Sequence, residues 1–207
     1  MIDIQGNWTA LTNELKKVQR DGIDKLIAYL ENDTDFKTAP ASTKFHLCEK
    51  GGLAEHSLNV LRYARLVNSQ MGNIIPDESL IISALMHDLC KVNYYVEGEE
   101  WDKEWKDKTN QWRKKAIWKV EDKEPLGHGE KSVILTVRHI PLSIEEMAAI
   151  RWHMTGFDAG IHFSYPSGIP YRESMNRYPL VKIIILADEM AELYESLGHK
   201  NSVSNTI

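Results

Sequence analysis

A histidine followed directly by an aspartate ends the most apolar helical stretch of this chain. His87 and Asp88 come after residues 80–86, where apolar side chains occupy almost every side of a predicted helix. Such a helix should be buried, and unpaired polar groups are costly to bury. A metal ion would satisfy both groups. The simpler alternative is that His87 and Asp88 cap the helix end through hydrogen bonds to the backbone.

More imidazole and carboxylate groups lie on or beside apolar helical faces elsewhere in the sequence. His56 precedes Val60 by about one helical turn on an amphipathic helix, and Asp188 shares the apolar face of Val181 in the last predicted helix. Each group alone is more typical of a satisfied core residue than of a ligand. Together they come from five predicted helices. The set consists of His56, His87, Asp88, His128, His153 and Asp188.

Imidazole and carboxylate ligands together suit a divalent metal, bound as one or two ions. Manganese, iron, cobalt, magnesium, nickel and zinc are the candidates. The set contains no thiolate, which argues against a structural zinc cage. Facing helices that project ligands inward are a standard way to build such a site. The residue types therefore predict a metal centre inside a helical bundle.

Helical spacing of apolar residues runs through most of the chain and accounts for these positions. A helix at 53–71 and a helix that begins at 76–77 are joined by a short turn, so we expect them to be antiparallel and to bring His56 close to His87. Two short helices split at Pro141 follow residue 129. A Gly/Pro-rich loop at 156–170 then leads to a final helix at about 179–197. The predicted fold class is therefore all-α.

Residues 92–126 break the helical pattern. Tyrosines and tryptophans alternate there with lysines and an arginine, and residues 116–120 have the composition of a strand, which would make this insertion irregular or a β-hairpin. One interpretation is a lid or side wall that stacks a base and contacts phosphates. The other is a surface excursion held by its aromatic residues, because nearby acidic residues nearly neutralise its cations. The sequence leaves both open.

Length and composition fit one ordinary globular domain. The 207 residues, 43% of them hydrophobic, can bury a sizeable core. We divide them into an N-terminal helical extension at 8–32, a core at about 40–195 that contains the insertion at 92–126, and a frayed tail at 198–207. No apolar run is long enough for a membrane span. The net charge of -5 argues against a mainly electrostatic grip on nucleic acid.

Two further observations concern the compartment. The first residues lack the basic-then-apolar form of a signal peptide. Cys48 and Cys90 provide no disulfide framework, so we expect a cytoplasmic protein. Cys48 and His46, in a predicted loop at 31–52, are interpreted as structural. Nothing in the sequence fixes the oligomeric state.

The order of the candidate ligands resembles that of the HD superfamily of metal-dependent phosphohydrolases. His56, the His87–Asp88 pair and Asp188 follow the order of that superfamily, and the two extra histidines are similar to those of members that hold two metal ions. The local phrases look closest to the HD module of certain bacterial 3′-to-5′ exoribonucleases and uncharacterised relatives. These phrases lie at residues 51–57, 87–91, 127–128 and 152–153.

The resemblance implies an HD-domain helical bundle that hydrolyses a phosphoester or phosphoanhydride bond of a small phosphorylated molecule, which we expect to be a nucleotide. Asp88 and Lys91 are the expected catalytic residues, with Lys91 contacting phosphate and Arg151 as a weaker candidate for that role. One ion would be held by His56, His87, Asp88 and Asp188, and Asp88 would bridge to a second ion on His128 and His153. The alternatives are a small 3′-to-5′ exonuclease acting on short single-stranded nucleic acid, and a non-catalytic sensor of metal and nucleotide.

Two features depart from the pattern of the superfamily. Cys90 stands where glycine is common, a change that a helix end tolerates and that leaves Lys91 in register. The nucleic-acid-binding domain that accompanies the module in the exoribonucleases has no counterpart in these 207 residues. An exonuclease would therefore need its grip on nucleic acid from the module itself. No general acid stands out in the sequence.

Overall fold

A computed structural model describes residues 1–106, 112–155 and 168–203, and helices dominate them. The prediction of an all-α bundle with a hairpin insertion is confirmed. The elements are α1 (Ile4–Leu15), α2 (Ile23–Asn32), α3 (Gly52–Gln70), α4 (Asp77–Met86), the short 3-10 helix η1 (Leu89–Lys91), β1 (Tyr95–Lys106), β2 (Trp112–Val120), α5 (His128–Val137), α6 (Ile144–Trp152), α8 (Gly168–Arg177) and α9 (Pro179–Val203).

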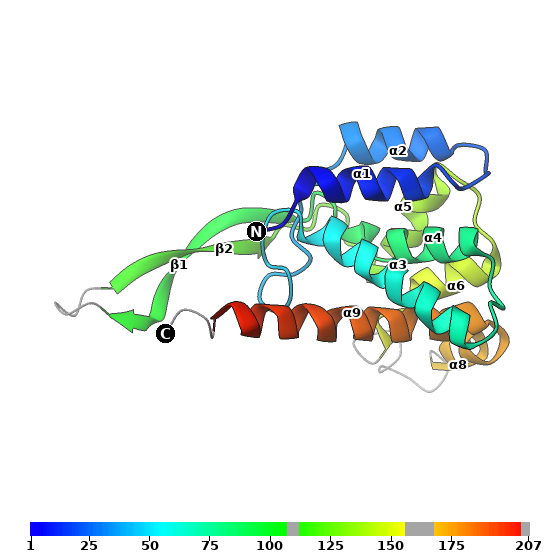
Figure 1. The fold of residues 1–207 in the computed structure, drawn as a ribbon. Coiled ribbons are helices and arrows are strands. Elements are labelled where there is room, and N and C mark those ends of the chain that lie inside the picture. Colours follow the sequence, from blue (N-terminus) through cyan, green and yellow to red (C-terminus); the bar gives the residue numbers. More distant parts are fainter. Residues whose placement is uncertain (107–111, 156–167, 204–207) are drawn as a thin grey trace.

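The helical body is built around α4. Every residue from Leu80 to Met86 is buried, as expected for a helix with apolar side chains on all sides. α3 and α9 pack side by side along the body, and both contact α4. α6 packs against α4 and α9. α1 and α2 form an outer layer (Figure 1). The site residues are therefore carried by the most extensively packed helices of the described chain.

A tight turn fixes the antiparallel arrangement of α3 and α4. The Asn68 side chain donates a hydrogen bond to the carbonyl of Ile75 at 2.9 Å and accepts one from the Ile75 amide at 3.0 Å. Asn73 supplies a positive φ of 56°, a conformation that asparagine adopts more readily than most residues. Because Asn68 at the end of α3 is bonded to Ile75 just before α4, the two helices run antiparallel. The start of α3 therefore lies beside the end of α4, as the sequence predicted.

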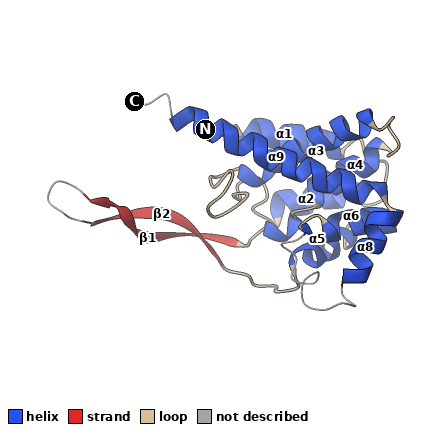
Figure 2. Ribbon diagram, turned by 90° about the horizontal axis from the view of Figure 1, so that it is seen from below, coloured by secondary structure: helices blue, strands red, loops and turns tan. Residues whose placement is uncertain are grey.

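The insertion is a long antiparallel hairpin that projects from the helical body (Figures 1 and 2). Its strands pair from Tyr95 with Val120 to Trp101 with Lys114. The second strand begins at Trp112, earlier than the strand predicted at 116–120. At the base of the hairpin, the Trp118 indole donates a hydrogen bond to the Cys48 carbonyl at 3.0 Å. This bond attaches the hairpin to the loop that precedes α3.

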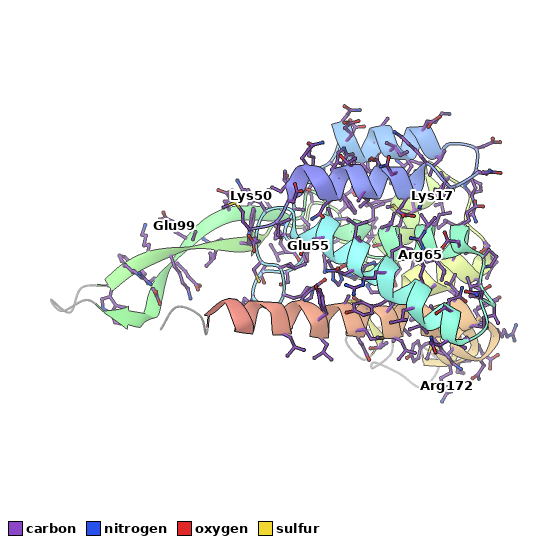
Figure 3. The ribbon with its side chains drawn as sticks, viewed as in Figure 1. Lys17, Lys50, Glu55, Arg65, Glu99 and Arg172 are labelled. Carbon is purple, nitrogen blue, oxygen red and sulfur yellow. The ribbon has the colours of Figure 1, made fainter. Side chains whose placement is uncertain are left out.

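Charged side chains of the hairpin pair with one another. Lys114 pairs with Glu99, Lys115 with Glu100 and Arg113 with Asp102 at 3.1–3.3 Å. At the base, Lys50 from the loop before α3 pairs with Glu97 at 2.6 Å; Figure 3 shows Lys50 near the base and Glu99 further out. Since these described cations already have acidic partners and the outer part of the hairpin points away from the helices, the geometry favours a surface excursion over a lid for that outer part.

Two boundaries differ from the prediction. α8 begins at Gly168, inside the predicted loop at 156–170, and Pro170 lies in its first turn, where backbone N–H groups have no partner within the helix. α9 continues to Val203, so residues 198–203 of the predicted frayed tail are helical. A single Gly198 costs a helix only about 1 kcal/mol. The rest of that loop, 156–167, and residues 204–207 lie outside the described residues.

Among the described helices, none combines the length and the apolarity needed to cross a membrane.

Candidate metal centre

The structure brings all six predicted ligands together at the centre of the helical body. His56 comes from the second turn of α3, and Asp188 faces it from α9. His87 and His153 occupy the residue that directly follows α4 and α6, respectively. Asp88 comes directly after His87, and His128 is the first residue of α5. Five helices therefore position the six side chains.

One group of four ligand atoms surrounds a common point on one side of Asp88. His56 Nε2 lies 3.1 Å from Asp188 Oδ1 and 3.8 Å from Asp88 Oδ2. His87 Nε2 lies 3.4 Å from Asp88 Oδ2 and 3.9 Å from Asp188 Oδ1. Ligands about 2.1 Å from one ion in tetrahedral geometry are about 3.4 Å apart. The spacing of this group therefore suits a single metal ion.

A second group lies on the other side of the same carboxylate. His128 Nε2 is 2.7 Å from Asp88 Oδ1, and His153 Nε2 is 3.5 Å from that oxygen. The rings of His128 and His153 are 5.2 Å apart, and the His87 ring lies 4.8 Å from that of His153. Asp88 thus presents one oxygen to each group of histidines, the arrangement expected of a carboxylate that bridges two ions.

Hydrogen bonds to the backbone orient two of the imidazoles. His87 Nδ1 donates to the Ala84 carbonyl and His153 Nδ1 to the Ile150 carbonyl, each at 2.8 Å. A carbonyl oxygen only accepts, so Nδ1 carries a proton and Nε2 is the nitrogen of each ring that is left to bind a metal ion. The buried atoms His87 Nε2, His153 Nε2 and Asp188 Oδ1 have no hydrogen-bond partner within the described part of the chain. A metal ion would satisfy all three.

Charge in the site also favours a cation. Burial opposes ionisation of Asp88, but Lys91 and the surrounding histidines outweigh it and hold the pKa of the carboxyl well below its usual range. Burial likewise opposes charge on His56, but the close carboxylates of Asp188 and Glu195 raise its pKa to about 10. Carboxylates that stay ionised in a buried site require compensating positive charge. Asp88 is therefore held in the anionic form that a divalent ion binds.

Lys91 lies at the edge of the first group. Its Nζ is 2.6 Å from Asp88 Oδ2, because the 3-10 helix η1 brings residues three apart in sequence onto the same side of the chain. Burial disfavours the ammonium, but Asp88 outweighs it and raises the lysine pKa above its ordinary value. Lys91 is thus a fixed cation beside the predicted ligands. Arg151, the weaker candidate, instead pairs with Glu130 at 2.5 Å and stacks on Trp152.

Cys90 fills the position where the superfamily pattern has glycine. Its backbone amide donates a hydrogen bond to Ser132 Oγ at 3.0 Å, and this bond connects η1 to α5. Burial raises the pKa of the Cys90 thiol to about 12, so sulfur is not ionised near neutral pH. The buried thiol lies close to the ligand atoms of Asp88 and His128, and Lys91 remains beside Asp88.

Two residues near the centre were missed as site residues. Glu195 accepts hydrogen bonds from His56 Nδ1 and from Asn59 Nδ2. His46, interpreted from the sequence as structural, is buried with its ring 4.8 Å from the His56 ring. Glu195 follows Asp188 by seven residues on one helix, and that spacing was the available signal. For His46, in an irregular loop, local spacing offered none.

Comparison with known families agrees with this geometry. The family model of the HD domain matches residues 53–193, so the chain belongs to the HD domain family. This membership places it in the superfamily of metal-dependent phosphohydrolases, whose members typically use divalent metal ions. No curated protein and no solved structure matches the chain.

Proposed function

We propose that this protein hydrolyses a phosphoester or phosphoanhydride bond of a nucleotide with two divalent ions. The main support is that the two carboxylate oxygens of Asp88 face different histidines. Oδ2 lies 3.4 Å from His87 Nε2, and Oδ1 lies 2.7 Å from His128 Nε2. In this proposal His56, His87, Asp88 and Asp188 hold the first ion, and Asp88, His128 and His153 hold the second.

The ions, when bound, would activate water and neutralise charge on the phosphoryl oxygens. The protein's own side chains do the positioning. Asp88 fixes the distance between the two groups because both of its oxygens are engaged. The backbone bonds of His87 and His153 hold their rings in one tautomer, so their Nε2 atoms are ready to bind without reorganisation.

Lys91 is the proposed phosphate contact. Its ammonium stands 2.6 Å from the carboxylate that would bind the ion, so a phosphoryl oxygen held there would lie within reach of a second positive charge. The lysine side chain is largely buried. Stabilisation by a positioned cation is strongest where charge develops during phosphoryl transfer.

Aromatic side chains next to Lys91 support a nucleotide over a sugar phosphate. Tyr95, at the start of β1, is close enough to Lys91 and Asp88 for their charges to affect its pKa, which burial raises to about 12. Its ring packs edge-on against Tyr94 at 4.9 Å. A base beside the phosphate site would find an aromatic surface there.

A phosphate-release screen of the manganese-loaded protein tests this proposal. The panel contains nucleoside mono-, di- and triphosphates, cyclic nucleotides, a sugar phosphate and a short single-stranded oligonucleotide, with His87→Ala as the inactive control. Release from one nucleotide class that the control lacks supports the proposal. Release only from the oligonucleotide would indicate the exonuclease, and saturable nucleotide binding without release would indicate the sensor.

A further inference from the structure

Both ring nitrogens of His56 face a carboxylate from the same helix. His56 Nε2 lies 3.1 Å from Asp188 Oδ1, and His56 Nδ1 lies 3.1–3.2 Å from the two oxygens of Glu195. Asp188 and Glu195 are seven residues apart on α9, which places them on one face two turns apart. α9 therefore brackets this imidazole from both sides.

Glu195 is buried, and its described partners are few. Its side chain is 1% exposed, and no described lysine or arginine forms an ion pair with it. Asn59, one turn after His56 on α3, donates from Nδ2 to Glu195 Oε1 at 2.8 Å. His46 Nε2 lies 3.9 Å from Oε2, beyond hydrogen-bond distance. A buried carboxylate normally needs a charged partner. The only ionisable group that hydrogen-bonds to it among the described residues is His56.

We propose that Glu195 is a positioning residue that makes His56 a metal ligand through Nε2. A carboxylate only accepts hydrogen bonds, so Glu195 requires a proton on Nδ1. A metal ion would then displace the Nε2 proton alone, and the Nε2 lone pair would be directed at Asp88 and Asp188. The Asn59 amide holds the carboxylate in place. This inference rests on the proposed metal centre and adds a residue outside the six predicted ligands.

The charge of Glu195 has a second effect. A carboxylate on the far side of a ligating imidazole makes the ring a stronger donor, and loss of such a partner typically weakens metal binding by about 10- to 100-fold. His87 and His153 have neutral backbone carbonyls in the equivalent position. Among the predicted ligands His56, His87 and His153, only His56 has an anionic partner at Nδ1, so it should be the strongest donor of the first group.

Metal affinity of chelator-stripped protein tests this role without relying on activity. Titration calorimetry with Mn²⁺ should show affinity lowered about 10- to 100-fold in Glu195→Ala. Glu195→Gln can still accept a hydrogen bond from His56 Nδ1 but lacks the charge. Its Mn²⁺ affinity should lie between that of Glu195→Ala and that of the native protein. Glu189→Gln, an exposed acid on the same helix, is the matched control and should change the affinity less than twofold. Circular dichroism checks that each variant is folded.

The comparison with His56→Ala separates two kinds of failure. If His56→Ala weakens Mn²⁺ binding while folded Glu195→Ala changes it less than twofold, the role of Glu195 is overturned and the metal centre stands. If neither changes it, the centre itself is overturned. Because Glu195→Ala could fail to fold, the His56 tautomer in the native, Zn²⁺-loaded protein is read independently from ¹⁵N chemical shifts. A proton on Nδ1 supports the proposal, and a proton on Nε2 overturns it.

Discussion

The amino group of Lys91 lies 2.6 Å from Oδ2 of Asp88, the carboxylate oxygen that faces His56 and His87. This pair sets a fixed cation at the edge of the metal centre. In a bound complex, phosphate oxygens would share that positive charge. The relationship also explains why a cysteine is tolerated between the two residues, since the direction of Lys91 depends on the turn of η1 and not on a glycine.

Replacing Lys91 with methionine should lower kcat/KM for the preferred substrate by about 10- to 100-fold, because a charge-assisted hydrogen bond contributes about 1.5–3 kcal/mol. Metal content should stay unchanged. Lys50→Met, which removes an exposed lysine at the hairpin base, is the control and should keep native activity. An active Lys91→Met enzyme with native kinetics would exclude the lysine from phosphate binding.

Chelation should lower the unfolding temperature. An ion present at about 100 times its Kd stabilises the folded state by about 2.7 kcal/mol, which corresponds to a Tm shift of about 5–10 °C for a chain of this size. Differential scanning fluorimetry with and without EDTA measures the shift. The His87→Ala variant should show a much smaller one. Equal Tm values for the native protein in both buffers would argue against a metal ion in the core.

A buried ion pair ties the segment between α1 and α2 to α6. Arg20 forms two 2.7 Å bonds to Glu146, which is fully buried, and one 2.6 Å bond to Glu78. Arg20→Ala should destabilise the protein by about 3–5 kcal/mol, because it leaves a buried carboxylate without its partner. Lys17→Ala, which breaks an exposed pair with Glu14, should cost less than about 1 kcal/mol.

The cost of Arg20→Ala should depend on pH. Burial opposes ionisation of Glu146, but Arg20 outweighs it and lowers the pKa of Glu146 below its ordinary 4.5. A lowered carboxyl pKa stabilises the fold above the unfolded-state value and loses that effect as the pH falls through the folded-state value. Urea unfolding should therefore show a smaller difference between native protein and variant below pH 4.5 than near neutrality. A difference that is constant with pH would contradict this assignment.

Trp118→Phe should loosen the base of the hairpin. The substitution keeps an aromatic ring but removes the indole donor to the Cys48 carbonyl, at a cost of about 1 kcal/mol. Tm should fall by about 2–4 °C. Trp101→Phe, further out and 57% exposed, is the matched control and should stay within about 0.5 kcal/mol of native stability. If both variants melt like the native protein, this hydrogen bond does not anchor the hairpin.

The sequence predicted which six candidate ligands lie together, but it did not predict the residues that surround them. Polar groups such as Asp188 are conspicuous in an apolar helix, so type and spacing alone singled them out. Glu195 lies between exposed neighbours, including Tyr194, and its burial depends on how α9 packs against α3. The seven-residue spacing from Asp188 indicates a shared helix face, but only the tertiary packing shows that Glu195 is buried there. The same holds for His46, which reaches His56 from an irregular loop.

The boundaries missed in the sequence have local causes. Pro170 suggested a loop because proline breaks helix interiors, but it stands in the first turn of α8, where it is tolerated. Gly198 suggested a helix end, but α9 continues past it. For the hairpin, composition indicated a strand pair. Its direction away from the bundle and the contact of Trp118 with the loop before α3 are tertiary features that composition does not predict.

Metal stoichiometry of the native protein and of His153→Ala, measured by mass spectrometry after manganese loading and desalting, tests the central claim most directly. His153 Nε2 lies 3.5 Å from Asp88 Oδ1, whereas the first group faces Oδ2. Two ions bridged by Asp88 predict close to two equivalents in the native protein, close to one in His153→Ala and none in Asp88→Ala. The same number of equivalents in native protein and His153→Ala would contradict a two-ion centre.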